Sequence, residues 1–184
     1  TAERALQLAP DEPEAHAALA IFLYTRNTEL PRALELAQRA VDLRPDEPRF
    51  HRMRDNCLWN LNVPATNVFL DLTEEHETPG LREALASARR TVERFPRDPL
   101  ARYELARHYR DIGRWADFER VNEETLALYP VANALVWKAR ARFALHGDLP
   151  GMKQVLDQVP ARVRGIERTV FGYFLYAAYT GEVD

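Results

Sequence analysis

The sequence has few of the residues and segments that tie a protein to a compartment or a membrane. It contains a single cysteine, Cys57, so no disulfide can form within the chain and nothing ties it to an oxidising compartment. It has no run of about 18 apolar residues, the length that a membrane-spanning helix needs. With 29% charged residues, the composition predicts a cytoplasmic protein without a membrane span.

Lysine is nearly absent, since only two of the 25 basic residues are lysines. This bias toward arginine is typical of a GC-rich coding genome and suggests a bacterial source. The net charge of −3 argues against a general nucleic-acid-binding protein. We therefore expect the partner to be a protein or a peptide rather than a nucleic acid.

Residues that could support catalysis or bind a metal are also scarce. Ser87 is the only serine, and it lies among alanines on an expected helix, without the strand-to-helix turn that exposes a nucleophile. Cys57 lies on an apolar helical segment, where a buried and unreactive thiol is expected. The acidic segment at residues 74–77 includes His76, but adjacent positions on a helix point in different directions. We therefore predict no enzyme activity, no metal site and no cofactor.

The chain does contain a repeat. Gly113, Gly147 and Gly181 recur at intervals of 34 residues, each at the end of an apolar helical run, and Pro96 and Pro130 share the interval. A unit of this length holds two short antiparallel helices, and neither can bury its apolar face without a neighbouring unit. The period predicts an all-α, right-handed superhelical solenoid of stacked antiparallel helix pairs.

Apolar periodicity and prolines give the expected helix bounds. In residues 31–44, for example, Ala33, Ala37 and Ala40 share one helical face, and Pro45 prevents the helix from continuing. We expect the first helices of the pairs at residues 13–25, 48–61, 99–112, 132–146 and 165–180, and the second helices at residues 1–9, 31–44, 80–95, 115–129 and 149–159.

These positions resemble the tetratricopeptide repeat (TPR) family, in which a small residue opens the second helix, another packs in its middle and a proline follows its end. Ala33, Ala40 and Pro45 fill these places. A later unit matches the family pattern at Leu105, Ala106, Tyr109, Gly113 and Trp115. The family's early tryptophan is replaced by His16, Arg102 and Val136. The resemblance covers nearly the whole chain and implies a TPR-like array.

One unit is longer than the others. Pro45 and Pro96 are separated by 51 residues instead of 34, which places an insertion at residues 63–79, between the two helices of one unit. Residues 67–76 could form an additional short helix. Insertions in such arrays tend to lie on one face and sometimes serve binding, although an elaboration that only packs against the array is the favoured interpretation.

Both ends of the sequence fall inside the repeat. Thr1 begins within a second helix and Asp184 follows a first helix, so we expect residues 1–184 to be a single TPR-like array, truncated inside a repeat at both ends, from a larger protein. The last helix is apolar on nearly all sides from Val170 to Tyr179. Because a terminal repeat needs a polar outer face, we expect further repeats or another chain to cover this helix.

In the TPR family the first helices line a concave groove that holds peptides. On this chain the resemblance places in that groove Arg49, Arg52, Asn56, Trp59, Tyr103, Arg107, Arg110 and Trp137, together with Glu14, Ala17, Ile21 and Tyr24 from the preceding first helix. Arginine binds carboxylates through two parallel hydrogen bonds, and aromatic side chains give large contact areas at low entropic cost. We therefore expect an acidic or aromatic partner. The alternative for each arginine is an ion pair with a neighbour such as Glu104 or Asp111.

The sequence thus predicts a non-catalytic protein–protein interaction scaffold whose helical-repeat groove binds a peptide or protein. The alternative is the regulatory or substrate-docking arm of a larger multidomain enzyme, such as a transferase or a signalling protein. Continuing 34-residue repeats on both sides would favour the scaffold. A flanking strand-rich domain with a nucleotide-binding loop would favour the enzyme arm.

Overall fold

The computed structural model describes residues 1–63, 78–129, 132–165 and 167–181. Over these residues the chain is helical and contains no strand. The elements are α1 (Ala2–Leu8), α2 (Pro13–Thr25), α3 (Leu30–Leu43), α4 (Pro48–Asn62), α5 (Pro79–Arg94), α6 (Pro99–Asp111), α7 (Trp115–Leu128), α8 (Ala132–His146), α9 (Leu149–Leu156), a 3-10 turn η3 (Ala161–Val163) and α10 (Glu167–Thr180). The expected bounds are confirmed to within two residues, except that α9 ends at Leu156 rather than at residue 159.

The helices begin where the sequence supplies the right chemistry. Pro13, Pro48, Pro79 and Pro99 occupy the first position of α2, α4, α5 and α6, where proline's missing amide hydrogen costs nothing and its fixed φ suits the helix. Side chains cap the free amides of several first turns, since Thr78 accepts from Leu81, Asp98 from Leu100 and Asp148 from Gly151, at 3.2, 3.0 and 2.8 Å.

The repeating glycines end the first helices in a left-handed conformation. Gly113, Gly147 and Gly181 have φ of 78°, 64° and 73°, a region that glycine enters without steric cost. In the turn between α2 and α3 the same kind of position is filled by Asn27, with φ of 52°. Asparagine tolerates this conformation better than most residues. The predicted placement of Gly113 and Gly147 at turns between helices is therefore confirmed.

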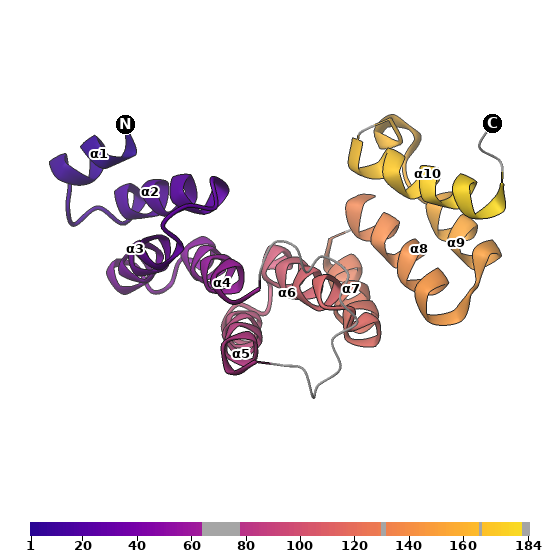
Figure 1. Ribbon diagram of the computed structural model, residues 1–184, viewed down its shortest axis with the longest axis horizontal. Coiled ribbons are helices and arrows are strands. Elements are labelled where there is room, and N and C mark those ends of the chain that lie inside the picture. Colours follow the sequence, from indigo (N-terminus) through magenta and orange to yellow (C-terminus); the bar gives the residue numbers. More distant parts are fainter. Residues whose placement is uncertain (64–77, 130–131, 166, 182–184) are drawn as a thin grey trace.

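The helices stack in one continuous row from α1 to α10 (Figure 1). Each packs on the helix before it and the helix after it, and α2 also contacts α4, α4 contacts α6 and α8 contacts α10. Among the residues that the structure describes, the buried apolar side chains form four clusters along this row rather than one central core. In α3, the small residues Ala33, Ala37 and Ala40 are each 0% exposed, which lets the neighbouring helices approach closely.

A repeated hydrogen bond fixes the entry of three first helices. The Nε2–H of His16 donates to the carbonyl of Pro10 at 2.7 Å, and that of His51 donates to the carbonyl of Pro45 at 2.8 Å. In the next unit the guanidinium of Arg102 donates to the carbonyl of Pro96 in the same way. Each donor lies six residues after its proline. In these three units the side chain at this position therefore ties the first helix to the end of the preceding second helix.

A buried carboxylate holds α4 and α5 together in the unit with the long connection. Asp55 is 2% exposed and accepts hydrogen bonds from Ser87 Oγ at 2.7 Å, from Thr91 Oγ1 at 2.5 Å and from Arg54 Nη2 at 3.0 Å. The flanking helices end at Asn62 and begin at Pro79. Residues 64–77, including the short helix expected at 67–76 and the acidic segment around His76, lie outside the described residues.

Candidate functional site

Three consecutive first helices, α2, α4 and α6, enclose a hollow of about 260 Å³. Its lining consists of Ala17, Ile21, Tyr24, Thr25, Arg49, Phe50, Arg52, Met53, Asn56 and Glu104. On α2 the lining residues Ala17, Ile21 and Tyr24 are spaced by four and three positions, so they form one stripe of the helix. The hollow therefore lies on the face that the sequence assigns to the groove.

The hollow combines an apolar wall with a few polar groups. Ile21 is 49% exposed and contributes free apolar surface. Burial raises the pKa of Tyr24 above its usual value, so its hydroxyl remains a hydrogen-bond donor. The Oδ1 atom of Asn56 accepts a hydrogen bond from Arg107 Nη2 at 2.6 Å. The amide nitrogen of Asn56 therefore points away from Arg107. The arrangement can bind apolar side chains and peptide carbonyl groups.

The groove arginines are all paired with carboxylates. Arg107 bonds to Glu104 at 2.7 Å and to Asp111 at 3.4 Å. Burial disfavours its charge, but the two carboxylates outweigh that effect and raise the pKa of Arg107. Arg110 bonds to Asp111 at 2.9 Å. The ion pairs of these guanidinium groups lie within α6, as in the alternative interpretation of an ion pair with Glu104 or Asp111.

Two further arginines face carboxylates on other elements. Arg52 on α4 lies 3.1 Å from Asp98, which precedes α6, and Arg49 lies 2.6 Å from Glu14 on α2. Arg49 also lies over the ring of Phe50, 4.7 Å from its centroid. The charges of the groove arginines are thus close to balanced by these carboxylates.

The expected position of Trp59 on the groove surface is wrong. The sequence places it on the groove surface, but it is 3% exposed and belongs to the apolar core. Its ring stacks on His108 with centroids 4.1 Å apart and ring planes 9° apart. The imidazole of His108 is completely buried, and this burial, followed by the nearby charges of Arg107 and Arg110, lowers its pKa well below the usual value. Trp59 and a neutral His108 therefore support the groove from beneath.

The remaining expected residues lie away from the hollow. Trp137 on α8 is half-buried, and its ring is covered by the guanidinium groups of Arg110 and Arg140, at 4.0 and 4.4 Å from its centroid. Tyr103 on α6 is also half-buried and does not line the hollow. The structure thus brings together Arg49, Arg52 and Asn56, while Trp137 with Arg110 forms a separate cluster further along the array.

The arrangement of helices is similar to that of known repeat proteins. A thermophilic TPR protein of Thermus thermophilus matches with a TM-score of 0.74 and 19% identity, over 97% of this chain and 87% of the other. MamA matches with a TM-score of 0.55 and 15% identity, over 97% of this chain and 88% of the other. The chain has a TPR-like fold. No protein-family model and no curated protein sequence matches the chain.

The TPR-like array offers little for catalysis among the residues that the structure describes. No group of three histidine, cysteine, aspartate or glutamate side chains there is placed to hold a metal ion. Cys57 is 0% exposed, and burial raises the pKa of its thiol to about 12, so the reactive thiolate is suppressed. None of the described helices is both long enough and apolar enough to span a membrane.

Two features of the TPR-like array are not among the predictions from the sequence. The first is the tie from His16, His51 and Arg102 to a proline carbonyl. In three units a hydrogen-bond donor follows a proline by six residues, and this repeated spacing indicates the tie. The second is the network around Asp55, for which the only signal was an acidic residue on the apolar side of an amphipathic helix.

Proposed function

We propose that the chain is a TPR protein that acts as a non-catalytic scaffold, binding a peptide or protein segment along its concave face. The observation that carries this proposal is the hollow of about 260 Å³ enclosed by α2, α4 and α6. It is formed by helices of three consecutive units, so a segment lying there would contact several repeats at once. Apolar side chains and hydrogen-bond donors alternate around it, which suits an extended peptide.

The contacts that we propose for the partner follow from the lining. Ile21, 49% exposed, provides the apolar contact, while Tyr24 and Asn56 donate hydrogen bonds to the backbone of the bound segment. Arg49, 48% exposed at its side chain, is the most accessible of the groove arginines and is the residue to which an acidic group would bind. An acidic or aromatic partner therefore remains our prediction, with its acidic group at Arg49.

The experiment compares two neighbouring apolar residues of α2. A peptide is first selected from a display library against the wild-type protein, and its affinity is then measured for Ile21→Ser and Phe22→Ser. Both residues are 49% exposed, but only Ile21 lines the hollow. Loss of the buried aliphatic contact should weaken binding to Ile21→Ser by about 1.5 kcal/mol, roughly tenfold, and Phe22→Ser should bind as the wild type does.

The outcomes separate the groove from other surfaces. Equal binding of the peptide to the wild type and to Ile21→Ser would show that the concave hollow is not the binding site. A further arm replaces acidic residues of the selected peptide by their amides. Unchanged affinity there, together with a flat response to salt, would remove the acidic partner while leaving the groove in place.

We also propose that α10 is covered by further repeats or by another chain. Val170, Phe174 and Tyr179 are 45%, 54% and 49% exposed, which is a large apolar exposure for one helix. Tyr179 reaches back to Phe143, with ring centroids 4.3 Å apart, but Val170 and Phe174 remain open. A protein that is monomeric by light scattering and binds no hydrophobic dye would contradict this proposal.

A further inference from the structure

A second and larger hollow, of about 550 Å³, lies between α3 and α5 with α4 as its floor. It faces away from the concave groove. Arg54 and Leu58 line it, whereas Arg52 and Asn56 line the concave hollow, and two residues along an α-helix correspond to a rotation of about 200°. The two hollows therefore lie on opposite sides of α4, and they can be occupied independently.

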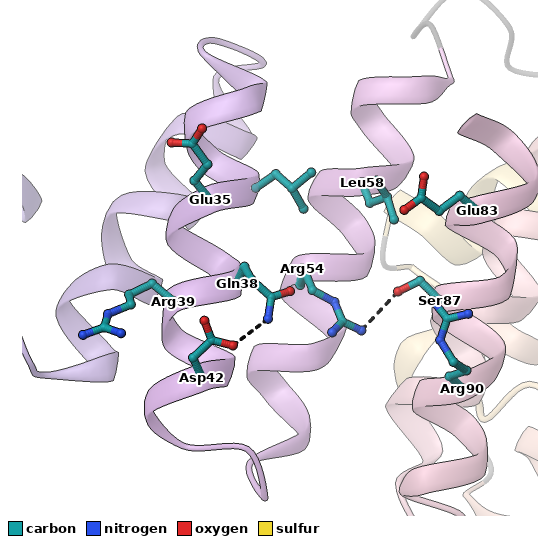
Figure 2. A pocket seen from close by; sticks show the side chains of 10 residues that line it. Glu35, Gln38, Arg39, Asp42, Arg54, Leu58, Glu83, Ser87 and Arg90 are labelled. Atoms are coloured by element: carbon teal, nitrogen blue, oxygen red, sulfur yellow. Dashed lines mark hydrogen bonds between the residues drawn. The ribbon is translucent and has the colours of Figure 1, made fainter. Parts of the chain in front are cut away.

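The hollow exists because α3 and α5 both pack on α4 but hardly touch each other. Figure 2 shows the two walls, with Gln38 and Asp42 on α3 and Ser87 and Arg90 on α5. Hydrogen bonds stiffen these walls, from Gln38 to Asp42 at 2.8 Å and from Arg54 to Ser87 at 3.1 Å. Half-buried Leu34 and Leu58 supply apolar surface between them.

The charges lining this hollow do not balance once their partners are counted. Arg39 pairs with Asp11 at 3.7 Å and Arg54 pairs with Asp55 at 3.0 Å, and both acids lie outside the lining. The other charged groups of the lining make no ion pair among the described residues: Glu35, Asp42, Glu83 and Arg90. The lining itself holds three carboxylates and three guanidinium groups, and with Asp11 and Asp55 included five carboxylates stand against three guanidinium groups. The hollow has an excess of negative charge beside an apolar floor.

We propose that this hollow is a second docking site, which takes an arginine or lysine side chain from an extended segment of a partner protein. Long basic side chains lay their aliphatic stems on apolar surface and keep the charged head group at its edge. Here the stem would lie on Leu34 and Leu58, and the head group would face the carboxylates of Glu35 on α3 and Glu83 on α5. Such a bond between charged groups is stronger than a neutral hydrogen bond.

Two synthetic peptides serve as probes, acetyl-Leu-Arg-Leu-amide and its neutral counterpart acetyl-Leu-Gln-Leu-amide. Their dissociation constants are measured by NMR titration at low salt on the full chain. The arginine peptide should bind at least about tenfold more tightly than the glutamine peptide, and the double variant Glu35→Gln/Glu83→Gln should lose that difference. Both replaced residues are exposed, so the variant should fold as the wild type does.

Two matched variants serve as controls. Glu93→Gln replaces an exposed glutamate of α5 outside the hollow, and Glu104→Gln replaces the glutamate that lines the concave hollow. Neither should change the affinity for the arginine peptide. Equal binding of the two peptides, no binding at millimolar concentration, or undiminished binding to the double variant would overturn the proposal. An effect of Glu104→Gln alone would overturn it while supporting the concave groove as the peptide site.

Discussion

The buried carboxylate of Asp55 gives the most direct test of how the long unit is held together. In Asp55→Ala, the hydroxyls of Ser87 and Thr91, which are 3% and 2% exposed, lose their acceptor, and Arg54 loses its counter-ion. A hydrogen bond to a charged group contributes about 1.5 to 3 kcal/mol. Removing one member of a buried ion pair costs about 3 to 5 kcal/mol.

Two compensations set the expected loss near the lower end of that range. Each freed hydroxyl can turn to a backbone carbonyl of its own helix, as Thr125 does toward Val121 at 2.8 Å. Arg54 is 18% exposed at its side chain, so water can solvate part of its charge. We therefore expect Asp55→Ala to lower the free energy of unfolding by about 3 kcal/mol and the melting temperature by about 6 to 12 °C.

Urea unfolding followed by far-ultraviolet circular dichroism measures this loss. Hydrogen exchange should show earlier opening of α4 and α5 than of α8 and α9. The matched control is Asp42→Ala. Asp42 is an exposed aspartate of α3 whose one hydrogen-bond donor among the described residues is Gln38, so its replacement should change stability by less than about 0.5 kcal/mol. A loss below about 1 kcal/mol in Asp55→Ala, or an equal loss in the control, would refute the reasoning.

Three other predictions follow from single residues. Gly147→Ala should lower the free energy of unfolding by about 1 to 2 kcal/mol, because φ at this position is 64°. The control is Gly165→Ala, where a methyl group also meets no neighbour and the loss should be much smaller. Equal losses of the two variants in urea unfolding would contradict this. The pKa of His108 in the folded protein lies below the value of about 6.5 in the unfolded chain. Below about pH 6.5 the unfolded chain therefore binds more protons than the folded protein, and the free energy of unfolding should fall as the pH drops. His108→Gln should reduce that slope, leaving the part due to His51, whose pKa burial also lowers; an unchanged slope would assign the effect to other groups. Cys57, with a thiol pKa of about 12, should react with a thiol reagent only after unfolding, and rapid reaction of the native protein would show that α4 opens locally.

The helix pairs could be predicted because their signals are local and periodic. Glycine enters the left-handed region without strain, so Gly113, Gly147 and Gly181 mark the ends of first helices, and proline cannot continue a helix, so Pro45 ends another. The helical period also predicts which side chains share a face. Ala17, Ile21 and Tyr24 share one face of α2 by this period, and all three line the hollow.

Two things could not be predicted from the sequence. One is which side of the last turn of a helix faces the neighbouring helix, and the other is which charged side chains form ion pairs between units. Trp59 turns toward α6 and stacks on His108, a residue from the next unit. Arg52 meets Asp98, whose main local role is to cap α6. Such contacts depend on the rotation of one helix against another and on side-chain rotamers, and neither leaves a periodic signal.

The described buried residues are divided into four clusters and do not form one core. This division has a mechanical consequence for the protein. The cluster around Val136 and Leu156 is formed by α8, α9, α10 and the segment between α9 and α10, whereas the cluster around Leu19 and Cys57 joins α2, α3 and α4 and packs against Tyr24 and Met53 of the concave hollow. We therefore expect a load applied at that end of the row to open the nearest helices first. The helices at the far end should keep their packing, because they share no buried cluster with α9 and α10.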